Sequence, residues 1–311
     1  MNWLALVAVA TLANSTVIFI DNYVSDFYFK GRHAVSQKLF YGLAGIILAT
    51  AFLLIFGIDF TTTSPLNILI FMGAGALVSF AGIPYCRALE LDDSTNLGIF
   101  LQLAPVLYLV FGWFVLDQSF SPTQLIAFVI IFSAPLLIIF STRKRSRKIK
   151  LRAMFLAFLY VLIYVTGNII FVKENSVAGN LNFFSEIGLF ILGRSIFDVF
   201  IVSSRRTWRK RFFHVVKSSK GKVLRPLFVD FLIYAVATTT YRSALVSAPS
   251  VAIASAASDS AEPIAIFFLG LLFTLISPKF GREKMDKKTV LVHLVATILV
   301  VAGITVIQIT A

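Results

Sequence analysis

Charged residues are scarce in this 311-residue chain, because Asp, Glu, Lys and Arg together make up only 14% of it. A soluble domain carries roughly 25% of these residues. Hydrophobic residues make up 58%, and the mean hydropathy is +0.89. This composition excludes a water-soluble globular fold and indicates an integral membrane protein.

Cysteine and the common catalytic motifs are also missing. One cysteine, Cys86, excludes an intramolecular disulfide and a thiolate metal cluster. With only 9 Pro and 17 Gly beside 32 Phe, the chain is neither disordered nor collagen-like. It contains no Gly-rich phosphate loop, nucleophile elbow or His-Glu-x-x-His motif. We therefore expect no enzyme activity, catalytic residue, cofactor or bound metal.

Acidic residues are few, since 15 Asp and Glu stand against 28 Lys and Arg, a formal net charge of +13. Binding to nucleic acid would need a folded basic face with stacking aromatic residues. Here the basic residues lie in short segments between apolar runs, so we expect no nucleic-acid partner. Such segments are typical determinants of membrane topology.

Apolar runs are abundant. A helix that crosses the bilayer needs about 20 predominantly apolar residues. Ten such runs are present, and they predict an all-α integral membrane protein with ten transmembrane helices. The runs are Trp3–Ile20, Leu39–Ile58, Leu66–Leu89, Leu97–Leu116, Leu125–Phe140, Leu151–Val172, Phe183–Val202, Leu227–Leu245, Val251–Ile276 and Val290–Ile309.

The basic residues between these runs predict the orientation. In a ten-helix arrangement the basic segments all fall on one face, which the positive-inside rule assigns to the cytoplasm, with both termini outside. We expect a multi-pass protein of the cell (plasma) membrane. The basic residues are Lys30, Arg32 and Lys38, then seven between Arg143 and Arg152, nine between Arg205 and Arg225, and five between Lys279 and Lys288.

A weak internal duplication divides the chain into residues 1–142 and 143–311. Tyr85-Cys86-Arg87-Ala88-Leu89 closes the third predicted helix, and Tyr241-Arg242-Ser243-Ala244-Leu245 closes the eighth. The next helix in each half carries a mid-membrane proline, Pro105 or Pro263, expected to break the helix. Five helices per half is an odd number, so the two five-helix repeats would be inverted, related by a two-fold axis in the membrane plane.

With these features the sequence resembles the drug/metabolite transporter (DMT) superfamily, in particular its ten-helix EamA-type branch. The resemblance rests on Tyr85-x-x-Ala-Leu, on Leu103-Ala104-Pro105-Val106, and on the helix ends Ser133-Ala134-Pro135-Leu136 and Val301-Ala302-Gly303-Ile304. It implies a secondary carrier for the import or efflux of small metabolites, with a path between helices 3, 4, 8 and 9. The family's acidic residue after helix 4 corresponds to Asp117, whereas the second half has Pro278-Lys279. The branch is usually drawn with both termini in the cytoplasm, which is opposite to the orientation that the loop charges predict.

The ninth run carries two acids. Asp259 and Glu262 are three residues apart, which places both on one helix face among Ala and Ser residues. Pro263 removes a backbone hydrogen bond and frees the carbonyl of Ser258 or Asp259. Two carboxylates at low dielectric favour protonation of at least one of them, which gives a group that can bind and release a proton near neutral pH, as a proton-coupled carrier needs. The alternative is that both acids pair with an arginine and only join two helices.

Other intramembrane polar residues extend this candidate site. Arg194 is the natural partner for the two acids, although an i,i+4 pair with Asp198 explains it equally well. Gln102 precedes Pro105 as Ser260 precedes Pro263, and Tyr85 matches Tyr241 by the repeat. We expect Gln102, Ser260, Tyr85 and Tyr241 around a central site. A polar stripe in the eighth helix lines a path or is structural, and it consists of Asp230, Tyr234, Thr238 and Tyr241.

The sequence thus predicts a secondary active transporter that moves a small organic metabolite or drug by alternating access, with proton exchange at Asp259 and Glu262. Its partners would be this small-molecule substrate, protons and membrane lipids. The alternative is an integral-membrane lipid flippase or lipid-modifying enzyme whose basic cytoplasmic face attracts anionic headgroups. The mid-helix position of the acids favours transport, because lipid chemistry would place polar residues at the interface.

Overall fold

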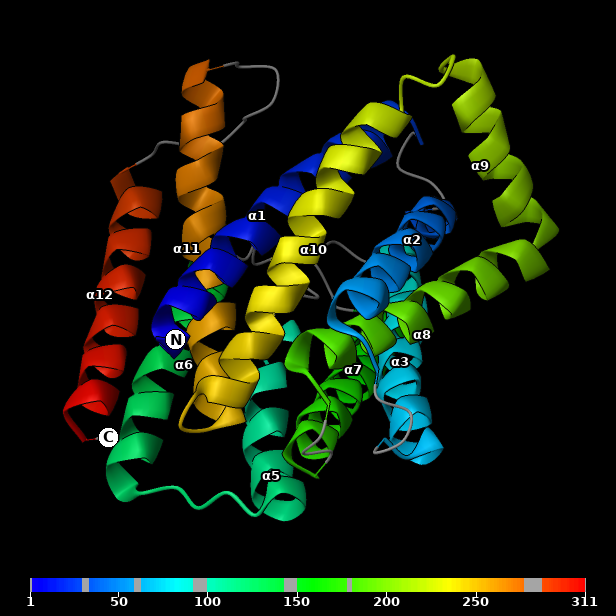
Figure 1. Cartoon of the computed structure of the whole chain (residues 1–311). Coiled ribbons are helices and arrows are strands. Elements are labelled where there is room, and N and C mark those ends of the chain that lie inside the picture. Colours follow the sequence, from blue (N-terminus) through cyan, green and yellow to red (C-terminus); the bar gives the residue numbers. More distant parts are fainter. Residues whose placement is uncertain are drawn as a thin grey trace. The chain divides into compact units, whose positions relative to one another are not determined.

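The computed structural model describes residues 2–29, 34–58, 63–91, 100–142, 150–177, 181–276 and 287–310. Throughout these ranges the regular structure is helical (Figure 1). The elements are α1 (Trp3–Phe27), η1 (Ala34–Gln37), α2 (Lys38–Phe56), α3 (Pro65–Leu91), α5 (Ala104–Leu116), α6 (Pro122–Thr142), α7 (Leu151–Val177), α8 (Phe183–Ser204), α9 (Arg206–Ser218), α10 (Leu224–Ser247), α11 (Val251–Ile276) and α12 (Lys287–Thr310).

Within the described residues, eight segments are long and apolar enough to cross a membrane. The bilayer core offers no water to backbone N–H and C=O groups, so an apolar segment there satisfies them internally by becoming a helix. The chain is therefore an α-helical, multi-pass membrane protein. The segments are Trp3–Asp21, Val35–Phe56, Pro65–Ala88, Pro122–Ser141, Leu151–Val177, Phe183–Ser204, Val251–Leu272 and Val290–Ile307.

Each of the ten predicted runs overlaps a helix, but two of these helices are not among the eight segments. α5 has 13 residues, and positions 97–99 of the predicted run lie outside the described residues. α10 has 24 residues, and polar side chains such as Asp230 and Arg242 lower its hydropathy. Positions 143–149 and 277–286, which make up much of two basic segments, also lie outside the described residues.

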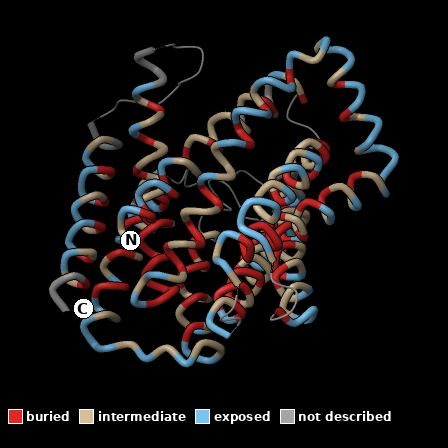
Figure 2. Tube along the Cα trace, viewed as in Figure 1, coloured by how far each residue is buried: buried red, intermediate tan, exposed pale blue. Residues whose placement is uncertain are grey.

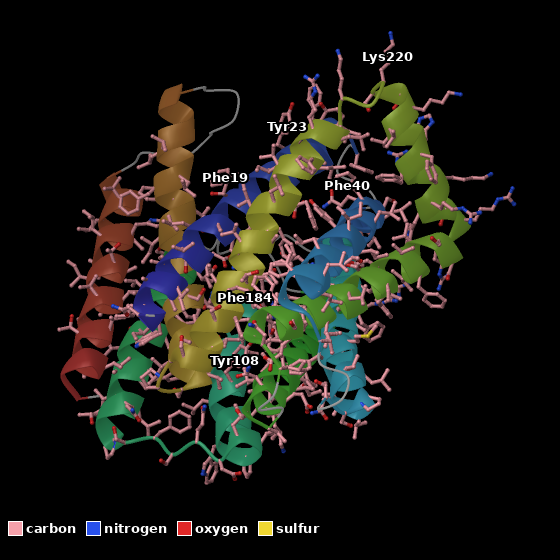
Figure 3. All side chains as sticks on the ribbon, in the orientation of Figure 1. Phe19, Tyr23, Phe40, Tyr108, Phe184 and Lys220 are labelled. Carbon is pink, nitrogen blue, oxygen red and sulfur yellow. The ribbon has the colours of Figure 1, made fainter. Side chains whose placement is uncertain are left out.

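The basic segment after the seventh predicted helix is not simply a loop, because it contains α9. Three apolar side chains at helical spacing, Trp208, Phe212 and Val215, pack on Val24, Leu39 and Leu227. A search for long apolar runs misses such an amphipathic helix, whose other face is basic. Lys220, in the turn that follows α9, extends away from the helices (Figure 3).

The two prolines differ from prediction. Pro105 lies in the first turn of α5 and not mid-helix, because residues 102 and 103 form a turn before it. A proline is tolerated there, since its missing N–H would have no intrahelical partner. α11 continues through Pro263 from Val251 to Ile276, so this proline does not break the helix.

The chain divides into two compact units, each assembled from both halves of the sequence. Unit 1 comprises Met1–Phe19, Ala88–Phe158 and Ile233–Ala311, and unit 2 comprises Ile20–Arg87 and Leu159–Leu232. Four helices, α1, α3, α7 and α10, contribute residues to both. The division of the sequence into repeats at residue 142 remains a prediction.

Helices pack closely within each unit. In unit 2, α2 packs along α8, and in unit 1, α6 packs along α12 while α11 contacts both α5 and α6. α3 and α8 approach backbone to backbone at two glycines. A Cβ atom added at Gly75 would lie 2.0 Å from the Phe190 carbonyl oxygen, and one at Gly193 would lie 2.0 Å from that of Met72. Small residues allow this approach between membrane helices.

Candidate functional site

The first half of α11 forms part of the interior of unit 1. Residues 251–258 are all buried (Figure 2). The Thr11 hydroxyl of α1 lies 3.2 Å from that of Ser258, and Ala257 packs against Leu6 of α1 and Ala244 of α10. The run of Ala and Ser therefore faces neighbouring helices, which explains why it lacks the bulky side chains that suit lipid.

Asp259 and Glu262 follow this buried segment on the same helix. The Asp259 Oδ2 atom accepts a hydrogen bond of 2.8 Å from Ser255 Oγ. Glu262 lies three residues further along α11. Within the described residues, no ion pair is formed by either carboxylate. The alternative that an arginine pairs with these acids therefore gains no support from the described part of the chain.

Two buried polar groups precede the two prolines at the same spacing. The Gln102 Oε1 atom and the Ser260 Oγ atom have no hydrogen-bond partner in the described part of the chain. Tyr241, on α10, is also buried. Gln102, Ser260 and Tyr241 share unit 1 with the α11 acids, whereas Tyr85 lies in unit 2, its ring centroid 4.8 Å from that of Tyr160.

Arg194 follows the simpler of its two predicted roles. Its Nε atom lies 3.8 Å from Asp198 Oδ2, an i,i+4 pair within α8. Arg194 belongs to unit 2, and the α11 acids belong to unit 1. Asp198 has a closer partner in Lys38, whose Nζ lies 2.9 Å from Asp198 Oδ1. The Ser79 hydroxyl also donates to this oxygen.

The assignment of Lys38 to a cytoplasmic loop is wrong, because Lys38 is the first residue of α2 and its amine points inward. The amine donates to the carbonyl oxygen of Ser79 at 3.2 Å and to its hydroxyl at 3.3 Å, besides Asp198. The side chains of Lys38 and Asp198 are 14% and 2% exposed. A cation in this position compensates a buried carboxylate, so it is not a solvated loop charge.

A second polar group in unit 2 surrounds Asp230. This residue of α10 is 1% exposed, and its Oδ2 atom is hydrogen-bonded to the Tyr41 hydroxyl of α2. The same hydroxyl lies 3.0 Å from Asp21 Oδ1 of α1. Gln37 Nε2 donates to that Asp21 oxygen at 2.9 Å. In the stripe predicted along α10, Thr238 and Tyr241 are buried as well, and Tyr234 is half-buried.

Asp21 and Tyr41 were not predicted as site residues. The first apolar run ends at Ile20, which left Asp21 outside the predicted helix, but α1 continues to Phe27. Helical spacing contained a signal, since Val17 and Val24 are buried and Asp21 falls between them on the same face. Tyr41 gave no comparable signal, because a tyrosine inside an apolar run usually packs or anchors at the interface.

Comparison with protein-family models and with curated protein sequences gave no match. The fold is similar to that of a solved structure described only as "Crystal structure of protein". The TM-score is 0.63 at 16% sequence identity, and the similarity covers 99% of this chain and 96% of that one. At this identity the similarity establishes a shared fold and carries no information about function.

Proposed function

We propose that this protein is a secondary carrier for a small organic solute, built from ten transmembrane helices in two inverted five-helix repeats. It resembles EamA-type carriers of the DMT superfamily. In this proposal α5 and α10 cross the membrane with the eight apolar segments. The basic segments, α9 among them, face the cytoplasm of a cell-membrane protein.

Helix packing supports the inverted repeat. In the ten-helix numbering, α2 and α8 are the second and seventh helices, α5 and α11 the fourth and ninth, and α6 and α12 the fifth and tenth. Each pair is in contact within one unit. Every pair thus joins a helix to its equivalent in the other repeat, as expected when a two-fold axis passes between equivalent helices.

The observation that carries the transport proposal is the acid pair on α11. Asp259 and Glu262 follow a buried helix half made of small residues, and no cation pairs with them within the described residues. Unpaired acids within a membrane span are costly and usually mark a substrate or proton pathway. We assign proton exchange to this pair, with Gln102, Ser260 and Tyr241 as polar groups of the same unit.

A ligand panel tests this function. The full-length protein in detergent is melted with amino acids, amines, sugars, nucleotides and glycerol phosphate, at mildly acidic and mildly alkaline pH. A small-molecule substrate at 100 times its Kd stabilises the protein by about 2.7 kcal/mol. We expect one solute class to raise the melting temperature of the wild type and to lose this effect in Asp259→Asn and Glu262→Gln.

The matched control is Asp117→Asn. This exposed acid at the end of α5 has φ near 52°, a conformation that asparagine also tolerates. The control is expected to respond to the solute like the wild type. The opposite result is that no solute stabilises the wild type and that both α11 variants melt well below it at either pH. The two acids would then be structural, and the carrier proposal would be wrong.

The lipid alternative has one observation in its favour, the basic outer face of α9. Arg206, Arg209 and Lys210 are exposed on this helix, where anionic headgroups are attracted. It predicts that glycerol phosphate, the headgroup analogue in the panel, stabilises the protein irrespective of Asp259 and Glu262. The same experiment therefore separates the two functions.

A further inference from the structure

The hydrogen bonds around Tyr41 require more hydrogens than the residues carry when both acids are ionised. The Tyr41 hydroxyl lies within hydrogen-bond distance of Asp21 Oδ1 and of Asp230 Oδ2. A phenol has one hydrogen and an ionised carboxylate has none, so two ionised acids leave one of these contacts without a hydrogen. One carboxyl group of the pair must therefore carry a proton.

The surroundings show which acid carries it. Asp21 Oδ1 already accepts a hydrogen bond from Gln37 Nε2, which favours an ionised Asp21. The other oxygen of Asp230, Oδ1, is buried with no hydrogen-bond partner in the described part of the chain. An acid in this position is more stable neutral than charged.

The charges of the network agree with this assignment. Asp198 pairs with the cations Lys38 and Arg194, whereas Asp21 and Asp230 meet through Tyr41. Three ionised acids would leave these five groups with one uncompensated negative charge. One proton on Asp230 makes these five groups neutral, which avoids the cost of an uncompensated buried charge.

We propose that Asp230 is a proton-binding site and that Tyr41 connects it to Asp21 as a proton relay. The Asp230 carboxyl O–H donates to Tyr41 Oη, and the Tyr41 O–H donates to Asp21 Oδ1. When Asp230 passes its proton to Tyr41 Oη, Tyr41 passes its own to Asp21. Asp230 is then ionised, Asp21 is neutral and Tyr41 is unchanged.

The site is built into its surroundings. Tyr41 stacks on Phe231 with ring centroids 6.5 Å apart. Val24 on α1, Leu39 on α2 and Leu227 on α10 form a buried cluster on the same three helices. Tyr41 packs against this cluster and connects the two acids directly. The proposal adds to the carrier function a proton site apart from Asp259 and Glu262. It rests on that function only in the assumption that the proton is used for transport.

Infrared spectroscopy of the full-length protein tests the site without a substrate. A protonated carboxyl group has a C=O stretch that a carboxylate lacks. At neutral pH we expect the wild type to show a protonated-carboxyl band that is lost in Asp230→Asn and retained in Asp117→Asn. Tyr41→Phe should keep the band at a shifted frequency, because Asp230 loses the acceptor of its hydrogen bond.

Each other outcome overturns the proposal. An identical carboxyl region in the wild type and Asp230→Asn means that Asp230 is ionised. A band that disappears in sodium chloride and returns in choline chloride assigns the site to sodium. If Asp230→Asn does not fold, the Tyr41→Phe spectrum decides, since an unshifted band excludes the relay. A failed ligand panel leaves this measurement unaffected, so the proton site and the carrier function stand or fall separately.

Discussion

At Asp198, two cations share one carboxylate. Arg194 is four residues away in the same helix, and this spacing alone predicts their pair. The Lys38 amine nevertheless lies closer, at 2.9 Å against 3.8 Å for Arg194 Nε. Lys38 is 160 residues away in sequence and is brought to Asp198 because α2 packs along α8. The stability of unit 2 therefore depends on an ion pair between two residues that are distant in sequence.

Lys38→Met tests this ion pair. The substitution keeps an apolar stem but removes the amine, so the 2%-exposed Asp198 side chain loses its closest cation. Removing one member of a buried ion pair costs about 3 kcal/mol or more. We expect a clearly lower melting temperature, measured in detergent by tryptophan fluorescence.

A second substitution separates loss of the charge from loss of packing. Lys38→Met combined with Asp198→Asn should recover part of the stability, because no uncompensated charge remains. Lys217→Met, on the exposed face of α9, should melt like the wild type. Equal melting temperatures for Lys38→Met and Lys217→Met would show that the pair contributes nothing.

At the scale of the elements, α3 and α8 are joined by contacts that only glycine permits. Gly75 faces the Phe190 carbonyl oxygen, while Gly73, two residues earlier on α3, has nothing within 4 Å of an added Cβ. The two positions share a helix and a residue type and differ only in what they face.

Gly75→Ala and Gly73→Ala are therefore a matched pair. A Cβ at position 75 would lie 2.0 Å from a backbone oxygen, so the helices must separate. Overpacking of this kind costs about 1–3 kcal/mol. Gly73→Ala should be neutral or stabilise by up to about 1 kcal/mol, through helix propensity. Unfolding in detergent measures both, and equal stabilities would mean that α3 and α8 are not in backbone contact.

At the scale of the whole molecule, the distribution of charge predicts the orientation. The chain has a single cysteine, Cys86, so a Cys86→Ser background allows one new thiol at a time. Lys217→Cys, on α9, should react with a membrane-impermeant maleimide only from the cytoplasmic side. Ser119→Cys, exposed between α5 and α6, should react only from outside.

Labelling in intact cells detects thiols on the outer side, and labelling in inverted vesicles detects thiols on the cytoplasmic side. The reverse pattern would place both termini in the cytoplasm, as the family resemblance implies, and would show that the basic segments do not determine topology here. Labelling of both thiols from one side would exclude an odd number of crossings between residues 119 and 217. The cysteine-free background controls for nonspecific reaction.

Composition and the lengths of the apolar runs alone determined the helical class and the positions of the long apolar helices. Val251–Ile276 was predicted with both boundaries correct, and Phe183–Val202 ends two residues before α8 does. This works because an apolar run in lipid satisfies its backbone only as a helix, whatever its neighbours are. The acid pair on α11 was found for the same reason, since a charge inside an apolar run is visible locally.

The tertiary structure alone decided which polar groups from different helices meet. Arg194, Asp198 and Asp230 were visible in the sequence, but Lys38, Tyr41 and Asp21 come from helices that only folding brings together. α9 was missed because its short apolar stripe is stabilised by the cluster around Val24 and Leu227 and not by its own hydropathy. Partner choice among buried charges depends on distances between helices, which no local pattern encodes.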